Sequence, residues 1–114
     1  MRMAAQTDDD LDGVDETQTY PDGTVVRVFC QRTTDDAYPS GWAYTLHYGA
    51  TDPDPPRTLA DGTLRGYDNA HEDIKGHELH VAPDPTPIET VFPGMLTLRR
   101  QFWEEIPKPE IDVA

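Results

Sequence analysis

The sequence has little cysteine and little lysine. Cys30 is the only cysteine in 114 residues, which excludes an internal disulfide and a zinc cluster built from cysteines. Lys75 and Lys108 are the only lysines, and 22 Asp and Glu against 9 Lys and Arg give a formal net charge of -13. A carboxylate-rich, lysine-poor composition is typical of proteins hydrated in concentrated KCl. We therefore expect a halophilic origin, with an ordinary acidic protein as the alternative.

Long apolar runs are also missing. No stretch approaches the roughly 20 apolar residues that cross a bilayer, and the first residues contain no apolar segment of the kind found in secretion signals. A single cysteine agrees with a reducing compartment, so we expect a cytoplasmic protein. At about 1 M salt the Debye length falls to roughly 3 Å, so the net negative charge does not exclude a nucleic acid partner.

Length and composition predict one folded domain after a short leader. The chain has the commonest domain size, and 36% hydrophobic residues, with two Trp, five Tyr and three Phe, can form a modest core. Residues 1–13 are acidic and have no apolar period, so we expect a disordered leader there. The single domain then covers residues 14–114.

Alternating residues predict strands, and a later change of period predicts a helix. Strands bounded by turns rich in Pro, Gly and Asp are expected at 14–20, 24–32, 42–48, 64–67, 77–81 and 88–92. From Pro93, apolar residues recur at helical spacing as far as Ile106. The predicted fold class is α+β: an antiparallel meander of about five strands with one C-terminal amphipathic helix packed on it.

Three of the four histidines lie in one ten-residue window. We take His71 and His77 as the candidate acid-base pair and His80 as a third catalytic candidate. Because the unperturbed pKa of histidine is about 6.5, one imidazole could take the proton of a ribose 2′-hydroxyl and another could protonate the leaving 5′-oxygen. Arg65 and Lys75 are the candidate phosphate-binding residues. This chemistry requires no metal and no other cofactor.

Neighbouring residues could orient these imidazoles. Tyr67, Asp68 and Asn69 are the candidate orienting residues, since a carboxylate or amide can hold the second nitrogen of an imidazole. Strand geometry limits the grouping: on a continuous strand His77 and His80 point to opposite faces, so only one could share a site with His71 unless a bulge or turn intervenes. His47, alone within a strand, is expected to be structural.

Two other interpretations of the same window stay open. In the first, the three histidines bind a metal with Asp68, Asp73 or Glu78 in a metal-assisted phosphodiesterase, although a His-x-x-His pair outside a helix is weak evidence for zinc. In the second, the window is a recognition loop of a non-enzymatic protein that acts by binding a partner. There Arg99 and Arg100, expected on the polar side of the last helix, would contact that partner.

The run Tyr67-Asp68-Asn69-Ala70-His71, followed by Lys75-Gly76-His77-Glu78-Leu79-His80, resembles the TumE-type toxin family. The turn at 20–23, the aromatic strand at 42–48 and the helix at 102–105 are also similar to that family, so the resemblance covers roughly residues 14–106 and suggests a haloarchaeal-like member. It implies the toxin component of a toxin-antitoxin pair, with a DNA-binding antitoxin of winged-helix type as partner. Cleavage of an RNA substrate is our inference from the histidines.

The sequence departs from the family pattern between its last histidines. Glu78 and Leu79 stand where a basic residue is usual. Arg65 and Lys75 are then left to supply the positive charge of the predicted site.

Overall fold

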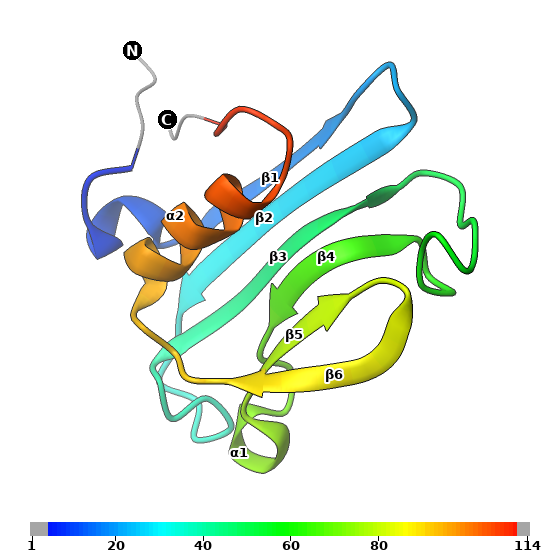
Figure 1. The fold of residues 1–114 in the computed structure, drawn as a ribbon. Helices are drawn as coiled ribbons and strands as arrows, with labels where there is room; N and C mark the ends of the chain where they lie inside the picture. Colours follow the sequence, from blue (N-terminus) through cyan, green and yellow to red (C-terminus); the bar gives the residue numbers. More distant parts are fainter. Residues whose placement is uncertain (1–4, 112–114) are drawn as a thin grey trace.

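The computed structural model describes residues 5–111 and contains one six-stranded antiparallel sheet (Figure 1). The strands lie side by side in chain order, so each pairs with its sequence neighbour as in a meander. Their bounds are β1 Val14–Thr19, β2 Thr24–Arg32, β3 Trp42–Ala50, β4 Thr63–Asp68, β5 His77–Val81 and β6 Asp84–Thr90. The predicted α+β meander is confirmed, with six strands where about five were expected.

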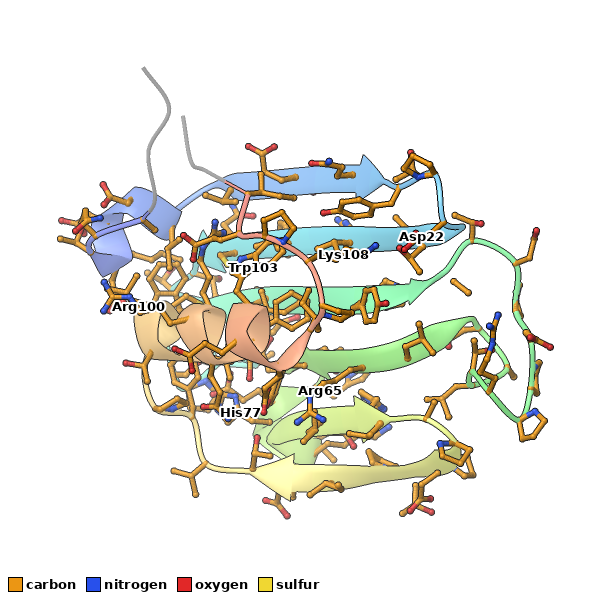
Figure 2. The ribbon with its side chains drawn as sticks, turned by 45° about the horizontal axis from the view of Figure 1, so that its top comes forward. Asp22, Arg65, His77, Arg100, Trp103 and Lys108 are labelled. Atoms are coloured by element: carbon orange, nitrogen blue, oxygen red, sulfur yellow. The ribbon has the colours of Figure 1, made fainter. Side chains whose placement is uncertain are left out.

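One face of the sheet is covered by the helix α2, Met95–Glu105, and we call it the covered face (Figure 2). Val26, Val28 and Cys30 of β2 point to this face and are 0% exposed, and Phe102 of α2 is equally buried against them in one core. The other face, which we call the open face, has no helix over it (Figure 1). Among residues 5–111, no helix is long and apolar enough to cross a membrane.

The segment expected as a disordered leader contributes to the core where it is described. Residues Asp8–Leu11 form the short helix η1, and Leu11 is 0% exposed. The Asp8 carboxylate accepts a hydrogen bond from the Leu96 amide at 2.9 Å, in the first turn of α2, which follows Gly94 and so has no capping side chain of its own. A single leucine in an acidic run has no period, which hid this contact. The first four residues of the expected leader lie outside the described residues.

The chain after α2 returns across the covered face toward the β1–β2 turn. Lys108 Nζ lies 4.3 Å from the centre of the Tyr20 ring and donates a hydrogen bond to Asp22 (Figure 2). This bond, together with hydrogen bonds from the hydroxyl and amide of Thr24, lowers the pKa of the Asp22 carboxyl to about 2.

The same segment buries Arg99, which corrects its expected place on the polar side of α2. The Arg99 side chain is 1% exposed, donates to the backbone carbonyl of Ile111 and lies 3.9 Å from the Glu110 carboxylate. A helix period alone did not reveal that the returning chain covers this side of α2. Arg100 remains exposed.

Two short stretches differ from the predicted loops. Residues Glu72–Lys75 form α1, a single helical turn between β4 and β5. Strand β6 begins at Asp84, four residues before its predicted start, because a tight turn brings Asp84 opposite Val81. Pro85 and Pro87 are accommodated because β6 is an edge strand, where a missing amide donor need not break a ladder.

Candidate functional site

The three histidines of the predicted window occupy three different environments. His77 is on the covered face and His80 on the open face of β5, as the alternation of a regular strand requires. His71 precedes α1, is exposed, and has the left-handed backbone angle φ of 61°. The structure therefore does not gather them around one point.

His77 is held by contacts on every side. Its Nδ1 lies 2.6 Å from the hydroxyl of Tyr44, its ring stacks on Phe92 with centroids 4.8 Å apart, and its Nε2 lies 3.5 Å from the Glu72 carboxylate. Only 13% of its side chain is exposed. Burial raises the pKa of Tyr44, so this phenol stays protonated near neutral pH. Both nitrogens of His77 are thus used in fixing the end of the sheet.

Asn69 orients this cluster from a fully buried position. It is 1% exposed, and its amide nitrogen donates to the carbonyl of Trp42 and to the Glu72 carboxylate, both at 2.6 Å. Its amide oxygen accepts from the Tyr44 backbone amide at 2.9 Å. Ser40 donates to the same Glu72 carboxylate from its backbone amide and its hydroxyl. Asn69 therefore orients Glu72, which the sequence analysis had not named.

The predicted phosphate-binding residues lie apart. Arg65 donates to Glu105 at 2.8 Å on the covered face, near the C-terminal end of α2 (Figure 2). The hydroxyl of Tyr67 donates to the other oxygen of the same carboxylate at 2.5 Å. Together they tie β4 to α2. Lys75 is exposed at the end of α1.

A cavity of about 200 Å³ opens on the other face of the sheet. Two histidines line it: His47 on β3 and His80 on β5, with Gly66 of β4 directly between them in the strand register. Two strand spacings place their Cα atoms roughly 10 Å apart. The remaining lining residues are Thr45, Leu46, Leu59, Asp61, Thr63, Tyr67 and Asp68.

Gly66 contributes no side chain to the cavity between the strands of the two histidines, and the His47 imidazole lies over Gly49, where a Cβ atom would come within 2.7 Å of its Nε2. A Cβ atom at Gly66 would come within 3.0 Å of the Leu46 carbonyl oxygen on β3. Asp68, one of the predicted orienting residues, has its Oδ2 2.8 Å from Nε2 of His80. The prediction had placed Asp68 near an imidazole, and the structure pairs it with His80.

The second histidine of the cavity, His47, is partly buried. Burial lowers the pKa of His47, the positive charge of Arg27 lowers it further, and the negative charge of Asp61 opposes both. Arg27 lies directly opposite His47 in the β2–β3 register. A neutral imidazole, suited to accept a proton, is therefore favoured at this position near neutral pH.

The sequence analysis did not group His47 with His80, because His47 stands alone in its strand. A usable signal existed: His47 alternates with Leu46 and Tyr48, so it points away from the predicted core, toward the same side as His80. This alternation, combined with the predicted meander, would have placed both histidines on the same face of the sheet. The exact register, through Gly66, depends on the bulge near Tyr48 and Gly49.

Comparison with known proteins gives one match over nearly the whole chain. A model of the family described as Toxin TumE matches residues 5–109. No curated protein and no solved structure matches the chain. The match covers the covered face, the open-face cavity and the window that carried the resemblance. The chain belongs to the TumE toxin family, which implies a toxin role and a cognate antitoxin partner.

Proposed function

We propose that this toxin is a metal-independent ribonuclease whose active site is the open-face cavity. The observation that supports the proposal is that His47 and His80 line one cavity from β3 and β5, with Gly66 between them in the strand register. Acid-base cleavage of RNA needs two proton-transferring groups with the phosphate between them. On this proposal His80 keeps its predicted catalytic role, and His47 becomes its partner.

The proposed reaction assigns one proton transfer to each ring. Neutral His47 takes the proton of the ribose 2′-hydroxyl, and the 2′-oxygen attacks the adjacent phosphorus. The bond to the 5′-oxygen breaks as protonated His80 gives that oxygen its proton, leaving a 2′,3′-cyclic phosphate and a free 5′-hydroxyl. Asp68 holds the His80 ring from 2.8 Å, as a carboxylate does in a catalytic triad.

The proposal also changes which positively charged residue binds the phosphate: Arg27 takes this role in place of Arg65. Arg27 is on the open face beside His47, with 45% of its side chain exposed and a 3.4 Å contact to Asp15. Such an exposed pair is weak and easily exchanged for a phosphate contact. Arg65, by contrast, is tied to Glu105 on the other face. The catalytic roles of His71 and His77, and the phosphate-binding role of Lys75, stay predictions that belong to an alternative site, and His71→Ala in the experiment below tests that alternative.

The test is cleavage of a fluorogenic RNA oligonucleotide by purified protein in high KCl with EDTA present. We expect His47→Ala and His80→Ala each to lower the rate by about 100-fold or more, the usual worth of a general acid or base. His71→Ala is the matched control, because it removes an exposed imidazole from the same part of the chain. It should cleave at the wild-type rate.

Each other outcome contradicts the proposal in a different way. Loss of cleavage in His71→Ala with full activity in His80→Ala would move the site to the α1 end of the sheet. Loss of all cleavage in EDTA would indicate a metal-assisted phosphodiesterase. A folded wild type that cleaves no RNA would favour inhibition by partner binding.

That last function, a non-enzymatic one, is favoured by a specific observation. Ile74 on α1, Ile88 on β6 and Val91 after β6 are 78%, 51% and 91% exposed. Residues His77 and Thr90 pair at this end of the sheet, so the α1 turn and the end of β6 are neighbours (Figure 1). Exposed apolar side chains at such a place are typical of a protein-binding surface. Val91→Thr and Ile74→Thr should weaken capture of the co-expressed antitoxin, for which we propose a DNA-binding, winged-helix type.

Halophilic origin is a further part of the proposal, together with a cytoplasmic location. It is supported by the net charge of -13, which repels itself most strongly at low ionic strength. Circular dichroism during dialysis against KCl-free buffer tests it. We expect loss of structure that returns when KCl is restored, and a protein that stays fully folded would contradict it.

A further inference from the structure

Three potential metal ligands converge beside the open-face cavity. One donor atom each from Asp68, Glu78 and His80 lies within 4.8 Å of the others, and within residues 5–111 no other such group of three is found. Asp68 and Glu78 are direct partners in the β4–β5 register, and His80 follows Glu78 by two residues on the same face. All three come from paired strands of a sheet, which holds ligands more precisely than loops do.

The negative charges around these three residues favour the binding of a cation. Asp68 pairs with Glu78 and Glu78 pairs with Glu89, so three carboxylates stand side by side across β4, β5 and β6. Like charges directly opposite each other destabilise a sheet. One protonated imidazole would balance only one of the two carboxylates in the donor group. A divalent ion would balance both.

The ligand types select among the divalent ions. One imidazole and two carboxylates suit first-row transition metals, whereas Mg²⁺ and Ca²⁺ prefer sites built from oxygen alone. Three protein ligands leave at least one coordination position for water. Asp68 and His80 keep 29% and 27% of their side chains exposed, so an ion can enter from solvent.

We propose that Asp68, Glu78 and His80 bind a divalent transition-metal ion such as zinc, and that this ion inhibits the toxin by occupying the His80 imidazole. The metal site does not depend on the proposed ribonuclease activity. The inhibition by the ion does rest on that proposed activity. An imidazole bound to a metal ion cannot also take up the proton that makes it an imidazolium, so His80 cannot act as the general acid while the ion is bound. Glu78 binds the ion and has no part in the cleavage reaction.

Binding is tested first, on folded protein without RNA and without a polyhistidine tag. Calorimetric titration with zinc in high KCl should show one equivalent bound, and cobalt should give the visible absorption of a site with a nitrogen ligand. Glu78→Gln and His80→Ala should each weaken binding at least about tenfold. Glu89→Gln is the matched control, because it removes the next carboxylate of the row from outside the donor group. It should bind zinc as the wild type does.

Inhibition is tested in the RNA cleavage assay with added zinc and no EDTA. Wild type should lose RNA cleavage over the range of zinc concentrations that fills the site. Glu78→Gln should cleave RNA at the wild-type rate without zinc and should not be inhibited at those zinc concentrations. Zinc binding that survives in both Glu78→Gln and His80→Ala, or no zinc binding, would overturn the site. Activation by zinc would overturn the inhibitory role. If wild type cleaves no RNA, the ribonuclease proposal fails while calorimetry still decides the metal site.

Discussion

The covered and open faces of the sheet contain the same kinds of polar side chain in opposite circumstances. On the covered face, His77 is packed between Tyr44 and Phe92 and contacts Glu72. On the open face, His80 lines a cavity and lies near the carboxylates of Asp68 and Glu78. These two histidines are three residues apart on one strand. A histidine whose nitrogens are satisfied inside a packed layer stabilises the fold, whereas one that lines a cavity can exchange protons with a ligand.

This comparison suggests that mutations on the covered face should reduce stability and that mutations on the open face should reduce activity. The network of Asn69 and Glu72 fixes the end of the sheet from which β5 and its histidines extend. The strand register that aligns residues on the open face depends on this network. The following predictions test the division, beginning with the largest effect expected.

Phe102→Ala should cause the greatest loss of stability. Phe102 is 0% exposed and anchors α2 to the covered face, and truncating such a ring typically costs about 3–5 kcal/mol in the free energy of unfolding. Urea unfolding in high KCl measures the loss. Arg100→Ala, on the exposed side of the same helix, should stay within about 0.5 kcal/mol of wild type. Equal losses in the two variants would mean that α2 does not cover the sheet through Phe102.

Asn69→Ala should be the next most damaging change. It leaves buried backbone groups of Trp42 and Tyr44 without their side-chain partner, which costs about 1–3 kcal/mol. Gln18→Ala removes an exposed amide from β1 and should change stability little. The folded fraction of Asn69→Ala should still cleave RNA. Full stability combined with lost cleavage would instead make Asn69 part of an active site.

Gly66→Ala should separate the two effects on the open face. Its new Cβ would come within 3.0 Å of the Leu46 carbonyl oxygen, a small overpacking that we expect to cost about 1 kcal/mol. Because Gly66 also lines the cavity, the added methyl group should narrow it, and RNA cleavage should fall further than the folded fraction does. Parallel unfolding and cleavage measurements decide the point. A variant that is destabilised and fully active would place the substrate elsewhere.

The elements were predictable from sequence because their signals are local. The alternation at 42–48 and the helical period after Pro93 gave β3 and α2 nearly as observed. The pairing of one strand with the next depends on residues that lie far apart in the sequence. The cavity depends on the register that aligns His47, Gly66 and His80, and no one segment contains that information. The histidine window drew attention to His77 because sequence proximity does not show which nitrogens a fold will satisfy.

The smallest predicted effect is a pH dependence of stability that comes from His47 alone. Burial holds its pKa below the ordinary 6.5, with Arg27 lowering it and Asp61 raising it. Between these two pKa values, His47 therefore binds a proton more readily in the unfolded chain than in the folded chain. Stability is lost as pH falls from the unfolded pKa toward the lower folded one. Unfolding midpoints of wild type should thus decrease between pH 7.5 and 5 more steeply than those of His47→Gln. Gln18→Ala, which removes an exposed side chain without a titratable group, should keep the wild-type slope. The slope is informative even if His47→Gln is less stable at every pH, and identical slopes would show that His47 titrates as freely as it does in the unfolded chain.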